Sequence, residues 1–361
     1  MTIPNARPMN PDLPTRVAVV GAGAFGRNHL RVYRELEKAG YPVELAAVID
    51  PNDAARAAAA AQYGVRGFAT IEDCMAVARA ELKRVDAASV CVPTVQHATC
   101  ARRLMACGID LLIEKPLAPS LAEADEIVGL ARELGQVVQV GHLERFNPAV
   151  RAVRGLLNRP MFFEVHRLSV FTPRSLDVDV VLDLMIHDLD IVLKLVGQPV
   201  REVRAVGLPV LSRKVDIANV RLEFENGCVA NFTASRVSTE RVRKMRFFQP
   251  HQYLSLDFAR QDLLMIDVSA AAGLDMAQLA AMAALANAAG GSHPSAGMSL
   301  SKVPVEAGEP LRLEIEAFLD AVRGRTEPAV TVEDGRAALK LALEINASIA
   351  EHARRTGLSL R

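Results

Sequence analysis

Three glycines near the N-terminus form the residue pattern best suited to chemistry. Their Gly-x-Gly-x-x-Gly spacing follows the apolar run Val17–Val20, so the pattern predicts a strand that turns into a helix. In that setting the first glycine permits a tight turn, the second lets a pyrophosphate approach the backbone, and the third lets the helix pack on the strand. Taken alone, the spacing also fits an ordinary glycine-rich turn. The candidate pyrophosphate-binding residues are Gly21, Gly23, Ala24, Phe25 and Gly26.

A carboxylate in a suitable place supports the dinucleotide interpretation. Asp50 ends the next predicted strand, 24 residues beyond Gly26. Such a carboxylate can accept hydrogen bonds from both adenosine ribose hydroxyls and repels a 2′-phosphate, so it favours NAD over NADP. The alternative role for Asp50 is a turn or helix-cap residue before Pro51. With the glycines and Asp50 both present, the sequence predicts an NAD site.

A lysine follows a second apolar run, in the segment Leu111-Leu112-Ile113-Glu114-Lys115-Pro116. A buried strand that ends here would hold Lys115 at the carboxyl edge of the sheet, where open parallel sheets bind ligands. Its ammonium group could orient the nicotinamide ribose and a reacting hydroxyl, and Glu114 could contact the cofactor or set the position of Lys115. Considered by itself, an ordinary surface lysine at a strand end is the more common situation.

An aspartate and a histidine form a third group, in a segment of otherwise apolar residues. Asp183 and His187 are four residues apart, so on a helix they share a face and can form a hydrogen bond. An imidazole paired with a carboxylate is a plausible general base at neutral pH. A buried structural pair explains the same spacing. A metal site is the weaker interpretation, because the segment offers neither a second histidine nor a cysteine pair, and we predict none.

Two smaller groups complete the candidates. Pro93, Thr94 and His97 follow a predicted strand and could contact the cofactor, although Thr94 could equally cap the next helix. Arg145 and Asn147 lie at the expected junction between domains, where they could reach a substrate phosphate or hydroxyl.

The elements that position the first groups alternate along the chain up to residue 141. Strands and helices of this length in alternation indicate a parallel, doubly wound sheet. The predicted strands are Arg16–Val20, Val43–Asp50, Ala87–Val92, Asp110–Glu114 and Val137–Val140, and the helices between them are Phe25–Ala39, Asp53–Tyr63, Thr94–Cys107 and Leu121–Leu134.

The rhythm changes after Phe146, where consecutive strands without intervening helices indicate an antiparallel sheet. A helix over Val180–Leu195 interrupts them, and Asn226-Gly227 predicts a hairpin turn. Two closing helices are expected over 311–323 and 332–351, whereas 269–300 is left unassigned. The predicted strands are Met161–Phe171, Val200–Leu211, Asp216–Glu225, Cys228–Ser235, Arg241–Gln249, Gln252–Asp257 and Leu263–Val268.

Together these elements define an α/β chain. A flexible segment over 1–15 precedes a doubly wound parallel sheet of the Rossmann type over 16–141. An α+β domain with a large, open, mostly antiparallel sheet spans 142–330, and a terminal helix over 331–361 is expected to pack back near the first domain.

Composition excludes several other classes of protein. The 361 residues carry 42 basic and 42 acidic side chains, so the zero net charge gives no reason to expect nucleic acid or an anionic membrane as a partner. Five cysteines without framework spacing argue against a disulfide scaffold. The first residues do not resemble a signal peptide, and no apolar run is long enough for a membrane span. We expect a soluble, cytoplasmic protein.

The set of motifs, in this order and spacing, resembles the Gfo/Idh/MocA family of NAD(P)-dependent sugar oxidoreductases over nearly the whole chain. The motifs are GAGAFG, Asp50, Glu114-Lys115-Pro116 and Asp183-x-x-x-His187. This resemblance implies a Rossmann domain, a second domain with an open sheet often used for oligomerisation, and a catalytic trio of Lys115, Asp183 and His187. It also implies a small-molecule substrate and a homo-oligomer, either a dimer or a tetramer.

Within that family, the segments around Arg145 and His187 resemble UDP-N-acetylglucosamine 3-dehydrogenases of lipid A biosynthesis, which oxidise a sugar hydroxyl to a ketone. The expected function is therefore NAD-dependent oxidation of the 3-hydroxyl of that nucleotide sugar, with His187 also contacting the substrate. Another sugar, UDP-sugar-acid or inositol dehydrogenase is the alternative within the family. A non-catalytic NAD-binding regulator and a structural oligomerisation module are the alternatives outside it.

Overall fold

The structure is a computed structural model that describes residues 12–171, 178–269 and 299–358, together with Asn10 and a few residues between 272 and 284. The chain divides into two compact units. The first contains residues 1–146 and 309–340, and the second contains residues 147–308 and 341–361. Most of the expected flexible segment over 1–15, and most of the unassigned segment over 269–300, lies outside the described residues.

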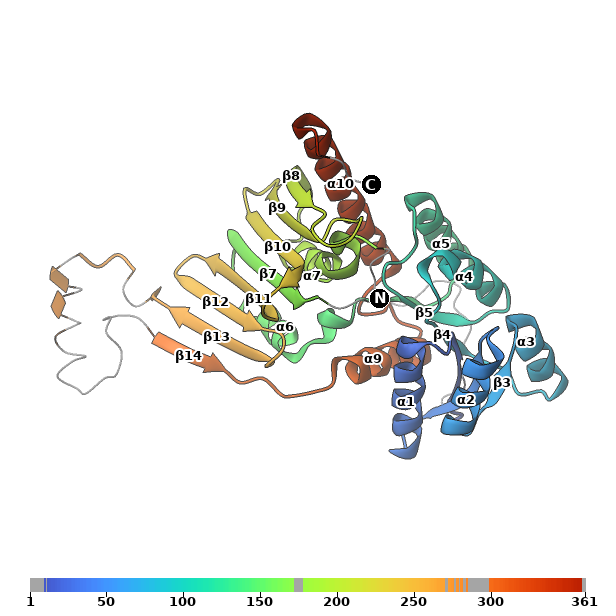
Figure 1. Cartoon of the computed structure of the whole chain (residues 1–361). Coiled ribbons are helices and arrows are strands. Elements are labelled where there is room, and N and C mark those ends of the chain that lie inside the picture. The colour runs from blue at the N-terminus through green and yellow to red at the C-terminus, as the bar shows by residue number, and fades with distance from the viewer. Residues whose placement is uncertain are drawn as a thin grey trace. The chain divides into compact units, whose positions relative to one another are not determined.

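The first unit is built on a parallel sheet of six described strands in the order β3-β2-β1-β4-β5-β6 (Figure 1). This order reverses direction between β1 and β4, the point at which doubly wound sheets bind ligands. The predicted doubly wound sheet is confirmed. The strands are β1 (Thr15–Val20), β2 (Val43–Ile49), β3 (Arg66–Phe68), β4 (Ala87–Val90), β5 (Asp110–Glu114) and β6 (Val138–Gly141), and the helices are α1 (Ala24–Lys38), α2 (Asp53–Tyr63), α3 (Ile71–Ala80), α4 (His97–Ala106) and α5 (Leu121–Leu134).

A helix from late in the sequence completes this unit. Helix α9 (Pro310–Gly324) buries Ile315, Phe318 and Val322 in the same hydrophobic cluster as Leu30 of α1. The observed division therefore differs from the expected boundary at residue 330, because the apolar face of α9 is buried against the Rossmann core. Helix α10 (Val332–Thr356) contributes its first residues to the first unit and the rest, from Leu341, to the second.

The second unit is built on a sheet of eight described strands in the order β14-β13-β12-β11-β7-β10-β9-β8. Strands β7 and β10 pair in parallel and the other described neighbours pair antiparallel, which confirms the predicted mostly antiparallel sheet. The predicted hairpin at Gly227 forms between β9 and β10. The strands are β7 (Phe162–Val170), β8 (Val200–Leu208), β9 (Ile217–Phe224), β10 (Val229–Ser238), β11 (Val242–Gln249), β12 (Gln252–Asp257), β13 (Asp262–Asp267) and β14 (Ser299–Val303), and the helices are α6 (Pro148–Val153) and α7 (Ile186–Val196).

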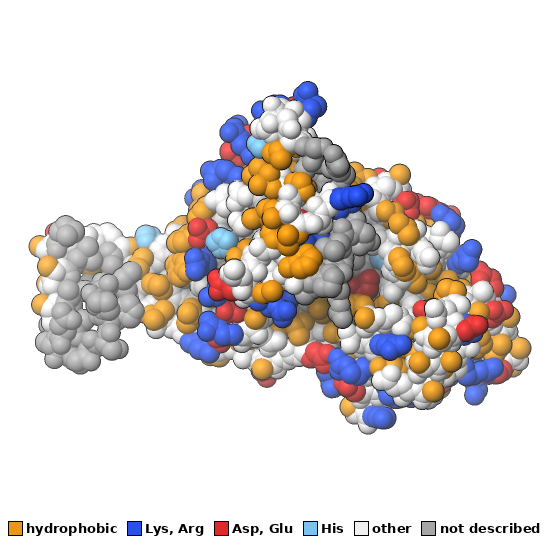
Figure 2. Space-filling view, in the orientation of Figure 1, with side chains coloured by type: hydrophobic (Ala, Val, Ile, Leu, Met, Phe, Trp, Pro, Cys, Tyr) orange, Lys and Arg blue, Asp and Glu red, His pale blue; other side chains and the backbone are white. Residues whose placement is uncertain are grey.

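The surface reflects the balanced composition. Figure 2 shows basic and acidic side chains interspersed over the visible face. Among the described residues, no helix is both long and apolar enough to cross a membrane.

A buried ion pair joins α7 to the sheet of the second unit. Nε and Nη2 of Arg167 each donate a hydrogen bond of 2.7 Å to a carboxylate oxygen of Asp188, and the Phe258 ring centroid lies 5.2 Å from the guanidinium carbon. Both side chains are almost fully buried. Removing one charge would therefore leave the other in a low-dielectric core.

We expect Asp188→Asn to lower the free energy of unfolding by about 3–5 kcal/mol, because Arg167 would lose its buried counter-charge. Urea denaturation measures the change. The matched control is Glu223→Gln, which removes the partner of Arg201 in an exposed pair of the same unit and should cost less than about 1 kcal/mol. Similar losses for both variants would contradict the assignment of a buried, stabilising pair.

Candidate active site

The glycine loop joins β1 to α1, and its glycines serve two different purposes. Gly21 has a φ of +102°, and a Cβ on it would lie 2.5 Å from the carbonyl oxygen of Cys91. A Cβ on Gly26 would lie 1.9 Å from the carbonyl oxygen of Gly21. By contrast, a Cβ on the exposed Gly23 would meet no described atom within 4 Å. The fold thus requires the first and third glycines, whereas Gly23 leaves room for a ligand to approach the backbone.

The start of α1 is suited to an anion. Gly23 is the N-cap residue, no described side chain forms a cap hydrogen bond there, and the first turn contains no acidic residue. The free N–H groups and the positive end of the helix dipole therefore point toward the loop. Ala24 and Phe25 are exposed beside them. This is the arrangement that binds a pyrophosphate in doubly wound folds.

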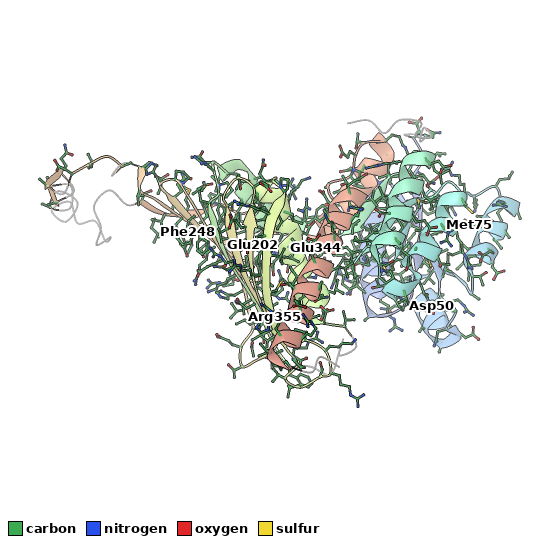
Figure 3. All side chains as sticks on the ribbon, turned by 90° about the horizontal axis from the view of Figure 1, so that it is seen from above. Asp50, Met75, Glu202, Phe248, Glu344 and Arg355 are labelled. Carbon is green, nitrogen blue, oxygen red and sulfur yellow. The ribbon has the colours of Figure 1, made fainter. Side chains whose placement is uncertain are left out.

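Asp50 follows β2 on the same unit (Figure 3). Its Oδ2 accepts a hydrogen bond of 2.6 Å from the Ala22 N–H in the glycine loop, and its Oδ1 accepts one of 2.8 Å from the Asn52 N–H. The N-cap of α2 is Asn52, whose side chain accepts from the Ala55 N–H. Asp50 therefore has the turn contact that was its alternative role, and it also stands directly beside the glycine loop.

We expect Asp50→Ser to weaken NAD+ binding by about 10- to 100-fold, since hydrogen bonds to a charged group contribute about 1.5–3 kcal/mol. The preference for NAD+ over NADP+ should fall with it, because the carboxylate that repels a 2′-phosphate is gone. Calorimetric titration with both dinucleotides measures the two effects. Asp53→Ser, which removes a nearby but highly exposed carboxylate, is the control and should bind like the unaltered protein.

The residues after β4 divide into accessible and buried ones. Pro93 is exposed and Thr94 is half-buried at the start of a short 3₁₀ turn, so both are open to a ligand. Thr94 does not have its alternative role, since the N-cap of α4 is Gln96. His97 is buried, with its ring nitrogens 3.0 Å from the carbonyl oxygens of Val92 and Pro116. Its two contacts connect the turn after β4 to the turn after β5. Burial lowers the pKa of His97.

Glu114 and Lys115 stand at the carboxyl edge of β5, next to β4. Both are half-buried. The Glu114 carboxylate lies 2.9 Å from Nε2 of His29, a residue of α1. A strand end at this edge is where the sheet order places a bound ligand.

In the second unit, the predicted helix begins with one wide turn. Residues Val181–Met185 form a π-helical turn that contains Asp183, and His187 lies in the first turn of α7. Asp179 anchors the start, because its Oδ1 accepts hydrogen bonds of 2.9 Å from the N–H groups of Val181 and Leu182. Asp183 and His187 are both half-buried. Single π-helical turns of this kind occur frequently at functional sites.

Arg145 and Asn147 have other partners than the predicted substrate. Arg145 is 3% exposed and lies 3.5 Å from the carboxylate of Asp334, within the first unit. Asn147 is 2% exposed; its side chain accepts from the Ala149 N–H and donates to the carbonyl oxygen of Phe258. These contacts give both residues structural roles, so neither enters the proposal below.

One polar cluster of the first unit contains three residues that were not among the predicted ones, Tyr33, Ser89 and His29. It consists of Tyr33, Ser89, His29 and Glu114, linked by hydrogen bonds. The sequence carried a weak signal for it, because His29 and Ser89 are polar residues within otherwise apolar helix and strand faces, and such residues need partners.

Both parts of the chain are similar to known proteins. A family model described as an oxidoreductase family with an NAD-binding Rossmann fold matches residues 15–142, and a model of the GFO/IDH/MocA C-terminal domain matches residues 149–249. UDP-N-acetylglucosamine 3-dehydrogenase from Acidithiobacillus ferrooxidans is 34% identical over 336 residues, which are 92% of this chain and 97% of that protein.

Solved structures and a second group of relatives also belong to dehydrogenases. A structure of the Acidithiobacillus ferrooxidans enzyme has a TM-score of 0.79 at 32% identity and covers 93% of this chain and 98% of its own. An inositol 2-dehydrogenase from Leifsonia xyli is 31% identical over 201 residues, which are 54% of this chain and 56% of that protein. The predicted NAD-dependent oxidoreductase class is confirmed.

Proposed function

This chain belongs to the GFO/IDH/MocA family of NAD-binding oxidoreductases, and from that premise we propose that it oxidises the 3-hydroxyl of UDP-N-acetylglucosamine to a ketone. The observation that carries the substrate is the similarity to a UDP-N-acetylglucosamine 3-dehydrogenase over 92% of this chain and 97% of that enzyme. A relative that matches nearly the whole chain is a stronger guide to the substrate than one that matches about half of it.

The residues of the first unit fit a dinucleotide. The glycine loop and the free N–H groups of α1 would hold the pyrophosphate, and Asp50 would hold the adenosine ribose. Pro93, Thr94 and the strand end at Glu114 and Lys115 would contact the nicotinamide half. When bound, NAD+ supplies the acceptor for the hydride that leaves the sugar carbon.

The remaining chemistry is acid–base chemistry by side chains of this chain. His187 takes the proton from the reacting hydroxyl, and Asp183 orients the imidazole. Lys115 donates a hydrogen bond to the hydroxyl oxygen and stabilises the negative charge that develops on it. The sugar thus loses one hydride and one proton and becomes a ketone.

Oxidation of an inositol is the second candidate, because inositol 2-dehydrogenases also match this chain at 31% identity. That match covers 56% of the relative. The predicted place in lipid A biosynthesis and the homo-oligomer come from the family resemblance, and the cytoplasmic location comes from the composition. All three stay predictions.

NADH formation by the purified protein tests the proposal. With NAD+ and UDP-N-acetylglucosamine, and with glutamate and an aminotransferase added to remove the ketone, we expect sustained absorbance of NADH. With NAD+ and myo-inositol we expect none. Turnover of the inositol alone would favour the second candidate, and NAD+ binding without turnover of either compound would refute both substrates while leaving the family assignment intact.

A further inference from the structure

A continuous hydrogen-bond network runs beneath the glycine loop of the first unit. The Tyr33 hydroxyl lies 2.8 Å from Oγ of Ser89, which lies 3.1 Å from Nδ1 of His29. Nε2 of His29 lies 2.9 Å from Oε1 of Glu114. The side chains of Tyr33, Ser89 and His29 are fully buried, whereas the Glu114 side chain is 12% exposed. The hydrogen-bond network therefore leads from the core to the Glu114 carboxylate at the edge of the sheet.

The donors and acceptors available indicate in which direction each hydrogen bond of this network is donated. Burial raises the pKa of Tyr33 well above its usual range, so its hydroxyl keeps a proton that it can donate. Within the described part of the protein, the partner for that proton is Ser89. Ser89 in turn has its own hydroxyl proton to donate, and Nδ1 of His29 is the acceptor within reach. With Nδ1 as the acceptor, Nε2 of His29 is the donor to the Glu114 carboxylate.

The hydrogen-bond network connects the elements that border the carboxyl edge of the sheet, where a ligand would bind. His29 belongs to α1, Ser89 to β4 and Glu114 to β5, and the sheet order reverses between β1 and β4. A fourth element makes room for the carboxylate: a Cβ on Gly141 of β6 would lie 2.8 Å from Oε1 of Glu114. Two other elements thus border this carboxylate, α1 through His29 and β6 through Gly141.

A metal ion explains the cluster less well. One ligand atom each from His29, Cys91 and Glu114 lie within 4.8 Å of one another, which is compatible with a cation. However, burial, together with the negative charge of Glu114, raises the pKa of the Cys91 thiol well above its usual range, and metal binding needs the thiolate. Both ring nitrogens of His29 already have hydrogen-bond partners.

We propose that Tyr33, Ser89 and His29 are positioning residues that hold the Glu114 carboxylate, and with it the Glu114–Lys115 strand end, ready for the nicotinamide half of the cofactor. In this arrangement His29 accepts a hydrogen bond from Ser89 at Nδ1 and donates one to Glu114 from Nε2. The inference rests on the proposed role of Glu114 and Lys115 toward NAD+. It does not depend on which sugar is oxidised, so its test uses NAD+ binding and involves no substrate.

The first measurement is the state of His29 itself. In protein labelled with ¹⁵N-histidine, at a pH where the ring is neutral, we expect an acceptor-type resonance from Nδ1 and an N–H resonance from Nε2. The loss of these signals in His29→Gln assigns them. The opposite tautomer, with the proton on Nδ1, would mean that His29 does not donate to Glu114, and the proposal would be wrong.

The second measurement separates the hydrogen bonds from packing. A glutamine at position 29 can accept from Ser89 with its carbonyl and donate to Glu114 with its amide, so His29→Gln should bind NAD+ within about twofold of the unaltered protein. His29→Leu fills the same space without either bond and should bind about tenfold more weakly. Circular dichroism and thermal denaturation identify any variant that fails to fold. Equal affinity for Leu and Gln variants would overturn the proposal.

Gly141→Ala tests the same carboxylate without deleting a polar atom. Its methyl group must displace the end of the Glu114 side chain, so we expect about a tenfold loss of NAD+ affinity with little loss of stability. Gly129→Ala in α5 is the matched control, because a Cβ there meets no described atom within 4 Å. If Gly141→Ala binds NAD+ as tightly as Gly129→Ala, the position of Glu114 is unimportant and the proposal is wrong.

Discussion

Lys115→Ala is expected to lower kcat/KM for the sugar by about 10²–10³-fold, the usual effect of removing one donor to a developing oxyanion. The reason is that the ammonium group stabilises negative charge that appears on the sugar oxygen only as the proton leaves. Because the effect is on the transition state, it should appear in kcat, whereas NAD+ affinity should change by less than about tenfold. Steady-state kinetics with calorimetric titration of NAD+ measure both quantities.

Two further variants make this prediction specific. Lys83→Ala removes an exposed lysine of the same unit and should leave the kinetics unchanged. His187→Ala removes the proposed general base and should cost about 10²–10⁴-fold in kcat, with a changed pH profile. If Lys115→Ala retains near-normal turnover while NAD+ still binds, Lys115 is the ordinary strand-end lysine that its sequence context alone would have suggested.

Local spacing explains why the turn between β1 and α1 could be predicted well from the sequence. The glycines, the strand before them and the helix after them are contiguous, so the pattern of Gly21, Gly23 and Gly26 already contains the turn that they form. Asp50 was found by its distance from that turn, and its hydrogen bond to the Ala22 N–H places it at the loop. The parallel sheet followed equally directly, from the alternation of short apolar runs with helices.

Contacts between distant parts of the sequence explain what could not be predicted. Arg145 and Asn147 look available for a phosphate until Asp334 and Phe258, more than a hundred residues away, are found against them. Helix α9 follows the second sheet in the sequence, yet its Phe318 is buried in the core of the first unit. Likewise, the hydrogen-bond partners of His29 come from two other elements, β4 and β5, so the sequence shows only a polar residue among the apolar residues of one helix face.

The π-helical turn at Asp183 shows a smaller limit of the same kind. The apolar residues around it predict a helix over Val180–Leu195, and a helical segment is present at Val181–Val196. The extra residue in the turn leaves no mark on the hydrophobic periodicity, and the hydrogen bonds from Val181 and Leu182 to Asp179 are seen only in the structure. The sequence thus locates the candidate base without revealing the local geometry that presents it.

The second large effect is expected from a pair of glycine substitutions in the nucleotide loop. Gly26→Ala should lower the free energy of unfolding by at least about 3 kcal/mol, because its Cβ would lie 1.9 Å from a backbone oxygen that cannot move without displacing α1. Gly23→Ala should cost less than about 1 kcal/mol, since its Cβ meets no described atom within 4 Å. Urea denaturation without cofactor compares the two variants.

Measurements of NAD+ binding then separate the glycine needed for the ligand from the glycine needed for the fold. Gly23→Ala should fold normally and yet bind NAD+ about 100-fold more weakly, since the new methyl group stands where a pyrophosphate must approach the helix start. Its defect would be in ligand binding alone, whereas that of Gly26→Ala would begin with the fold. Unchanged NAD+ affinity in Gly23→Ala would mean that the pyrophosphate does not approach this residue, and the glycine pattern would then describe only how β1 turns into α1.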